Sequence, residues 1–183
     1  SDGSGNIRKQ LNESKILFKN AGWTIKSNQL VNERTNEIFK FNIIIIQPSL
    51  ERVILPFTKN LKKLGIQVDI RVLDSSQYIE RINNYDFDMI VTTIPQSFNP
   101  GNEQINYWGS DSADIKGGRN LAGIKNIIID DLLKKIVFSS SRDELVAATK
   151  SLDRILLWNY YFIPQYHSPN NRIAYWNKFG KPT

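Results

Sequence analysis

The stretch IFKFNIIIIQ, residues 38–47, decides the fold because it contains four consecutive isoleucines among aromatic residues. Isoleucine is β-branched, so its side chain fits the pleated surface of a sheet better than the crowded surface of a helix. This stretch is too β-branched to be a preferred helix, and we predict that it forms a central strand. Pro48 and Ser49 follow directly and end the strand.

Toward the carboxyl end, apolar residues recur at helical spacing from Leu50 to Leu64. We predict a helix there, with Ser49 as its amino-terminal cap and Gly65 at its end. Pro56 lies inside this helix and should kink or loosen it. The next residues, 66–72, alternate between apolar and polar side chains, which predicts a second strand.

The following segment predicts a short helix and a third strand. Ser75 can cap a helix that continues through Ile82, and FDMIVTTI, residues 87–94, is short, apolar and β-branched. We therefore predict a buried strand over residues 87–94.

Toward the amino end, a helical stripe begins at Ile7 and stops at Gly22, which suits the left-handed position after a helix. A hairpin-like segment follows, with Asn28 and Asn36 near its bends. The leader SDGSGN, residues 1–6, is expected to be flexible, and the chain is expected to be part of a longer protein.

Two more helices are predicted near the carboxyl end. Asn126 can cap the first, and Ser141 with Glu144 forms a capping-box pattern that opens the second. The aromatic, proline-interrupted segment 160–183 is expected to form short strands and a closing segment. The alternation of helices and strands predicts one α/β domain over residues 1–183, with a mainly parallel or mixed sheet flanked by helices.

Between residues 95 and 126 lies a polar, glycine-rich stretch without clear periodicity. A connection of about thirty residues far exceeds the usual 4–6, which indicates a functional or disordered segment. Its aromatic rings, amides and opposite charges favour an ordered binding loop at the carboxyl end of a strand, where ligands gather in open α/β sheets.

The composition limits the possible functions. The 24 Lys and Arg residues exceed the 18 Asp and Glu residues, which gives a net charge of +6, so a basic nucleic-acid-binding module is the alternative function. The positive residues are scattered, however, and nucleic acid is not the expected partner. The absence of cysteine excludes disulfides, thiolate metal ligands and thiol catalysis. No apolar run approaches the about 20 residues that span a bilayer.

Several longer phrases resemble a known family. LKKLGIQVDIRVLDSSQYIERINNYDFDMI (residues 61–90), SFNPGNEQINYWGSDSAD (97–114) and ELVAATKSLDRILLW (144–158) are similar to the carboxyl-terminal lobe of extracytoplasmic solute-binding proteins. These proteins serve ABC importers of the peptide and nickel class, family 5, and the similarity is strongest to its YejA-like branch. The resemblance implies a lobe of the type II periplasmic-binding-protein kind.

The same resemblance implies a function. Such a protein closes two lobes on an extended oligopeptide or peptide-like solute in the periplasm and delivers it to a membrane permease, without catalysing a reaction. The partners would be the ligand, the permease and the missing amino-terminal lobe, toward which segment 160–183 would run. Better-known members hold the ligand's ammonium group with an Asp where this chain has Ser97, and Glu103 is the nearest loop carboxylate.

The ligand-binding residues that we predict all lie in the long loop: Ser97, Phe98, Asn99, Asn102, Glu103, Tyr107, Trp108, Arg119 and Asn120. Tyr107 and Trp108 could equally pack the loop onto the sheet. Arg119 follows two glycines that could form an anion-binding nest, or it could pair with Asp111 or Asp114.

Catalysis and cofactors are not expected. His167 is the one histidine and the one candidate for acid–base catalysis, and it has no assisting acid at a recognisable spacing. A peptide hydrolase is therefore the least favoured alternative. No metal is expected, because the chain has a single histidine and because adjacent Asp130 and Asp131 diverge on a predicted helix. No cofactor is expected either, because GGRN, residues 117–120, lacks the Lys and the Ser or Thr of a phosphate-binding loop.

Overall fold

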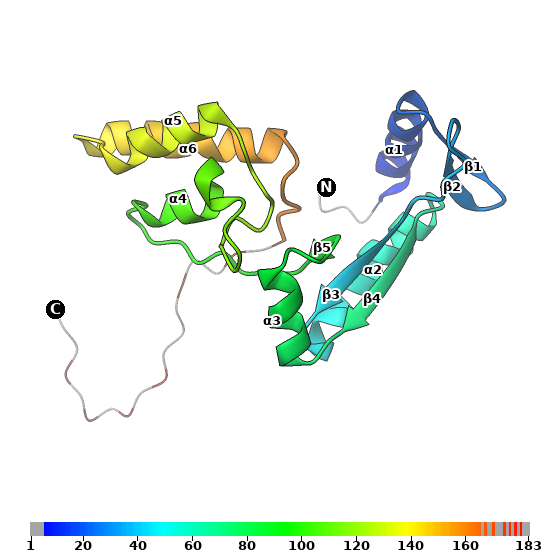
Figure 1. Ribbon diagram of the computed structural model, residues 1–183, viewed down its shortest axis with the longest axis horizontal. Coiled ribbons are helices and arrows are strands. Elements are labelled where there is room, and N and C mark those ends of the chain that lie inside the picture. Colours follow the sequence, from blue (N-terminus) through cyan, green and yellow to red (C-terminus); the bar gives the residue numbers. More distant parts are fainter. Residues whose placement is uncertain are drawn as a thin grey trace.

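The computed structural model describes residues 6–165, 167, 170, 174, 176, 178 and 180. Its central element is β3 (Lys40–Ile45), which lies parallel to β4 (Gln67–Val72) on one side and to β5 (Met89–Ile90) on the other (Figure 1). Ile43, Ile44 and Ile45 are almost completely buried. The predicted central strand is therefore confirmed, and burial of its isoleucines is the main reason for its position.

Helix α2 (Glu51–Lys62) packs against this sheet after a 3₁₀ turn at Pro48–Leu50. Its Ile54 joins Ile43 and Ile45 in one apolar cluster. The helix continues through Pro56. Ser49 was wrongly predicted as the cap, because it lies inside the 3₁₀ turn and no side chain caps this helix.

Helix α3 (Ser75–Asn83) begins one residue later than its cap, which is Asp74 and not the predicted Ser75. The Asp74 carboxylate accepts hydrogen bonds from the backbone N–H groups of Ser76 and Gln77, at 2.9 and 3.0 Å. A carboxylate also carries the charge that a helix amino terminus favours.

Strand β5 is much shorter than the predicted strand over residues 87–94. The carboxylate of Asp88 accepts hydrogen bonds from both the backbone N–H and the side-chain amide of Asn42, so regular pairing with β3 begins only at Met89. Beyond Ile90, the carbonyl of Val91 accepts a hydrogen bond from the Tyr78 hydroxyl at 3.4 Å. The side chains on either side of β5 thus limit its length.

The amino-terminal part has the predicted helix and hairpin. Helix α1 (Arg8–Asn20) is followed by Gly22 with φ of +80°, and then by the antiparallel strands β1 (Trp23–Lys26) and β2 (Gln29–Asn32). An isolated antiparallel bridge between Val31 and Ile38 connects the hairpin with the approach to β3. The hairpin forms a two-stranded antiparallel sheet of its own, separate from the three-stranded parallel sheet of β3, β4 and β5. Of the two predicted alternatives, the structure has the mainly parallel sheet.

The carboxyl-terminal half forms a layer of helices: α4 (Glu103–Trp108), α5 (Ile127–Val137) and α6 (Arg142–Trp158). The predicted caps Asn126 and Ser141 are confirmed. The expectation that residues 95–126 lack helical structure was wrong, because α4 and a 3₁₀ turn at Ser110–Ser112 lie within them.

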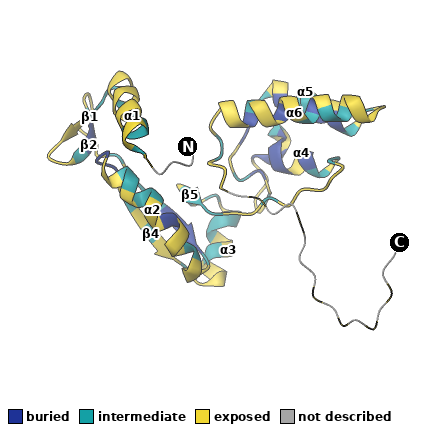
Figure 2. Ribbon diagram, turned by 180° about the vertical axis from the view of Figure 1, so that it is seen from behind, coloured by how far each residue is buried: buried dark blue, intermediate teal, exposed yellow. Residues whose placement is uncertain are grey.

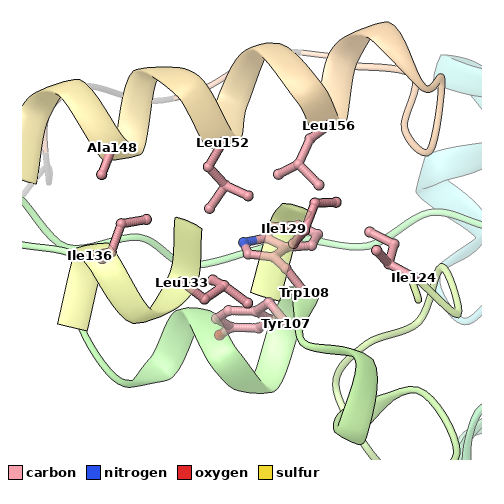
Figure 3. Close-up of a cluster of buried hydrophobic side chains, with 9 residues drawn as sticks. All are labelled: Tyr107, Trp108, Ile124, Ile129, Leu133, Ile136, Ala148, Leu152 and Leu156. Atoms are coloured by element: carbon pink, nitrogen blue, oxygen red, sulfur yellow. The ribbon is translucent and has the colours of Figure 1, made fainter. Parts of the chain in front are cut away.

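The helical layer has an apolar core of its own. In Figure 3, Leu152 and Leu156 of α6 point toward Trp108 on α4, and α5 contributes Ile129 and Leu133. Figure 2 shows the buried residues in α4 and on the sides of α5 and α6 that face it. The sheet and the helical layer are therefore stabilised by separate clusters.

Among the described residues, two hydrogen bonds connect the sheet region with the helical half. The Tyr85 hydroxyl donates to the carbonyl of Ile115 at 2.8 Å, and the Gly117 N–H donates to the carbonyl of Asn83 at 3.0 Å. Short strands had been predicted over residues 160–183, but residues 160–165 contain none. Most of the remaining segment, and residues 1–5 of the leader, lie outside the described residues.

Candidate binding groove

A groove of about 490 Å³ lies between the loop that precedes α4 and one face of α6. We call it the α6 groove. Its lining is contributed by the loop, by α4 and by α6: Gln96, Ser97, Phe98, Pro100, Gln104, Trp108, Arg142, Leu145, Val146, Thr149, Lys150, Leu152, Asp153 and Leu156. This volume falls within the range of sites that hold small ligands.

The helical repeat of α6 explains how that helix contributes to the groove. Arg142, Val146, Thr149 and Asp153 follow one another at intervals of three or four residues, which places them along one face. Leu145, Leu152 and Leu156 lie on the neighbouring face and form part of the apolar core. The groove therefore has an apolar floor and a charged rim.

Arg142 joins the two walls of the groove. Its guanidinium donates hydrogen bonds to the carbonyl oxygen of Phe98, at 3.4 Å, and to the side-chain oxygen of Asn99. These bonds position the loop, whose Phe98 side chain remains 91% exposed. Because a hydrogen bond holds the backbone at Phe98 while the residue stays exposed, its aromatic ring is well placed to contact a ligand.

Gln104 organises the base of the loop. It is 4% exposed, and its side-chain nitrogen donates to Gln96 Oε1 at 2.6 Å and to Glu103 Oε1 at 3.2 Å. Its side-chain oxygen accepts a hydrogen bond from Trp108 Nε1 at 2.9 Å. One buried amide thus satisfies the indole and fixes the loop against α4.

Glu103 hydrogen-bonds within the loop. Its Oε1 accepts the Gly101 N–H at 3.0 Å. Hydrogen bonds from the backbone N–H of Glu103 itself, from Gly101 and from the Gln104 side chain lower the pKa of the Glu103 carboxyl. The structure does not include Glu103 among the residues that line the groove. Its proposed role in holding an ammonium group remains a prediction.

These bonds predict a pH-dependent effect of Glu103→Gln. Because the folded-state pKa is lowered, the ionised carboxylate stabilises the fold above its unfolded pKa, and this stabilisation is lost as pH falls through the folded pKa. The variant should therefore melt below the wild type at pH 7, and the difference should disappear at acid pH. Thermal unfolding across this pH range measures it. Glu33→Gln is the control, because Glu33 is exposed and its carboxylate makes no hydrogen bond or ion pair among the described residues. An equal difference at every pH would contradict the prediction.

Tyr107 and Trp108 are each only 7% exposed and belong to the helical core. The Trp108 ring meets Phe162 edge-on, with ring centroids 5.0 Å apart. Trp108 also lines the groove, whereas Tyr107 does not. Packing thus accounts for most of the surface of both rings.

Arg119 and Asn120 lie outside the α6 groove. Arg119 donates to the Tyr107 hydroxyl at 3.1 Å instead of pairing with Asp111 or Asp114, and Asp114 pairs with Lys125. Asn120 is fully buried, and its amide hydrogen-bonds to the backbone of Gly109 and Ile124. These contacts hold the loop together.

The structure does not support the anion-binding nest at Gly117 and Gly118. The Gly117 N–H donates to Asn83, and the Gly118 N–H donates to the carbonyl of Ile115 at 2.8 Å. Both backbone N–H groups that a nest would offer to an anion therefore already donate to carbonyl oxygens of the protein.

The structure brings only some of the predicted residues together. Ser97, Phe98 and Trp108 line the groove, and Asn99 contacts its Arg142, while Asn102 is exposed at the start of α4. Sequence reasoning missed the α6 wall, including Arg142, Lys150 and Asp153. Their helical spacing was visible in the sequence, but the sequence did not show that they face the loop before α4.

Neither a metal centre nor a membrane span is found in the described part of the chain. No three His, Cys, Asp or Glu residues within it are grouped so as to hold a metal ion. Likewise, no helix among the described residues is both long and apolar enough to cross a bilayer. Asp130 accepts hydrogen bonds from the Ser110 N–H and hydroxyl, and Asp131 pairs with Lys134.

The fold is that of a type II-like periplasmic-binding-protein lobe. AppA, the oligopeptide-binding protein of Bacillus subtilis solved with a nonapeptide, superposes with a TM-score of 0.71 at 25% identity, over 82% of this chain and 30% of that one. DppA of Helicobacter pylori, solved with the peptide STSA, gives a TM-score of 0.68 at 21% identity, over 84% of this chain and 28% of that one.

The chain belongs to the bacterial extracellular solute-binding proteins of family 5. The family model described as "Bacterial extracellular solute-binding proteins, family 5 Middle" matches residues 2–115. A protein of Agrobacterium fabrum described as a probable peptide-binding protein, YejA, is 45% identical over 175 residues, which are 96% of this chain and 28% of that protein. The chain thus spans less than a third of the length of this relative.

Proposed function

We propose that this chain is the carboxyl-terminal lobe, residues 1–183, of the substrate-binding component of an ABC-type peptide import system. The complete protein captures an extended oligopeptide or peptide-like solute outside the cytoplasm and delivers it to a membrane permease, without catalysing a reaction. Family membership and the peptides bound by AppA and DppA support this proposal.

The observation that carries the proposal is the α6 groove, because its lining has the chemistry that an extended peptide requires. Phe98, Trp108 and the leucines of α6 provide apolar contacts for side chains. The hydroxyls of Ser97 and Thr149 donate to the carbonyls of Asn99 and Leu145, so their oxygens remain to accept from a peptide N–H. The side-chain nitrogen of Gln96, whose oxygen accepts from Gln104, remains to donate to a peptide carbonyl. Backbone hydrogen bonds with a few side-chain pockets allow many sequences to bind. We assign direct ligand contact to Ser97, Phe98 and Trp108 from the predicted set.

A second lobe completes the site in this proposal. The groove is open to solvent on this chain, and the Agrobacterium fabrum relative is more than three times longer than the part that this chain matches. Closure of another lobe over the groove would bury the ligand and exclude water, as in other binding proteins that close around ligands. The isolated chain should therefore fold and bind peptides weakly.

The test is a titration of the ¹⁵N-labelled 183-residue chain with peptides of two to eight residues, followed by NMR. We expect millimolar dissociation constants, with shifts concentrated at residues 96–104 and on α6. Phe98→Ala should weaken binding without loss of stability, because the ring is 91% exposed. Phe138→Ala, which removes another exposed ring at the end of α5, is the matched control.

Two results would count against the proposal. Absence of peptide-induced shifts at the groove would overturn it, and submicromolar binding by the isolated chain would show that no second lobe is needed. Binding to nucleic acid with a steep salt dependence would instead favour the basic-module alternative.

A further inference from the structure

The charges on the α6 groove are arranged asymmetrically along its length. Arg142 lies at the amino end of α6, where unpaired backbone N–H groups add positive potential. Asp153 lies eleven residues further along, in the carboxyl-terminal half of α6. Among the residues that line the groove, Arg142 is the charged residue at the amino end of α6, and Asp153 is the one carboxylate. Asp143 and Glu144 share the first turn of α6 with Arg142 but do not line the groove.

Arg142 has capacity for an anionic partner. Among the described residues it makes no ion pair, and its two hydrogen bonds go to the neutral oxygens of Phe98 and Asn99 through a single nitrogen, Nη1. A guanidinium has five N–H donors, so Nη2 and Nε remain for a ligand. Because the loop holds the guanidinium in place, little side-chain entropy is lost when a carboxylate binds.

Asp153 provides the complementary group. Its carboxylate lines the groove and forms no ion pair within the described part of the chain, although Lys150 lies one turn away. Lys150 is placed between Asp153 and Arg142 along the helix. The Arg142 end of the groove thus has a cation alone in its lining, whereas the other end has the Asp153 carboxylate with the Lys150 ammonium one turn away.

We propose that the α6 groove orients its ligand, with the ligand's free carboxylate at Arg142 and its amino end toward Asp153. This inference rests on the proposed function and specifies the binding mode. It also moves the ammonium-binding role from Glu103, which hydrogen-bonds within its own loop, to a carboxylate on the groove itself.

The spacing of the two charges indicates a ligand length. Eleven residues of α-helix correspond to about 16 Å along the axis. An extended peptide advances about 3.3 Å per residue, so about five residues place their terminal charges at the two ends of the groove. Shorter peptides reach Arg142 or Asp153 but not both, and longer ones extend beyond the groove.

Paramagnetic NMR tests the orientation directly. Pentapeptides with free termini carry a nitroxide on a cysteine side chain at position 1 or position 5, and the chain itself has no cysteine to react. We expect the position-5 label to broaden amide signals around Arg142 and the position-1 label to broaden those around Asp153. The reverse pattern, or equal broadening at both ends by both labels, would overturn the orientation. The proposed function would survive that result, because peptide binding at the groove would still be observed.

Terminal modification tests the chemistry. Amidation of the carboxyl end should weaken pentapeptide binding about tenfold, the loss expected for a hydrogen bond to a charged group. Arg142→Gln should bind free and amidated peptides equally, whereas the control Arg154→Gln, on the same helix outside the groove, should retain the difference. Arg142→Lys, which keeps the charge without the planar fork, should retain part of it.

The amino end has a corresponding test. Acetylation should weaken binding to the wild type and leave binding to Asp153→Asn unchanged, while Asp111→Asn serves as a control at an exposed position away from the groove. If acetylation weakens peptide binding equally in the wild type and in Asp153→Asn, the assignment of Asp153 is overturned. Absence of groove shifts with every peptide would overturn both this inference and the proposed function.

Discussion

Trp108→Ala is expected to lower the free energy of unfolding by about 3–5 kcal/mol, the usual cost of removing a large aromatic side chain from a core. The ring is 7% exposed and packs among the helices of the carboxyl-terminal half (Figure 3). Its removal leaves a cavity and also deprives the buried Gln104 amide of its indole partner. Urea denaturation followed by circular dichroism measures the loss.

The matched control is Trp158→Ala, which removes a ring that is 79% exposed at the end of α6. Its effect should stay within about 0.5 kcal/mol, as for most surface substitutions. A small effect of Trp108→Ala on stability, together with a large loss of peptide binding, would show that the tryptophan serves the ligand more than the core. Trp108→Phe would then separate the two roles, because it keeps much of the ring volume.

Gly65→Ala should cost about 2–4 kcal/mol, through a left-handed backbone and a steric clash acting together. Gly65 has φ of +80°, and a Cβ atom there would lie 2.6 Å from the backbone nitrogen of Leu30. The neighbouring backbone is fixed, because the Leu30 N–H donates to the Gly65 carbonyl at 2.8 Å. Relief of the clash would require separating α2 from the hairpin.

Gly22→Ala separates the two causes, because Gly22 has the same φ of +80° but nothing within 4 Å of an added Cβ. It should cost only the backbone term of about 1–2 kcal/mol. Thermal or urea unfolding of both variants measures the difference. Equal losses would mean that the backbone near Leu30 yields easily and that the clash contributes nothing.

The local sequence predicted those features that depend on neighbours in the chain. The isoleucines of β3, the hairpin turn near Asn28 and the caps Asn126 and Ser141 were all predicted correctly. Each depends on side-chain shape, backbone preference or a hydrogen bond across at most three residues. The predicted α/β fold follows from the same regularities, and the family resemblance gave its type.

Errors arose where a distant group determined the outcome. The ladder of β5 begins only after Asp88 because its carboxylate pairs with Asn42, 46 positions away. Residues 103–108 form a helix whose aromatic side chains pack against α5 and α6. The composition of the loop does not reveal that these two helices lie beside it. Long-range contacts of this kind override weak local preferences.

The sequence by itself thus determined the order of helices and strands as far as β5, the central strand and the region of the chain that forms the groove's loop. The tertiary structure alone decided which residues share the groove, because Arg142 meets Phe98 across 44 positions of sequence. It also assigned Asn120 and most of Trp108 to the interior. Residue type states what a side chain can bind, but burial and the neighbours brought by folding decide whether a ligand can reach it.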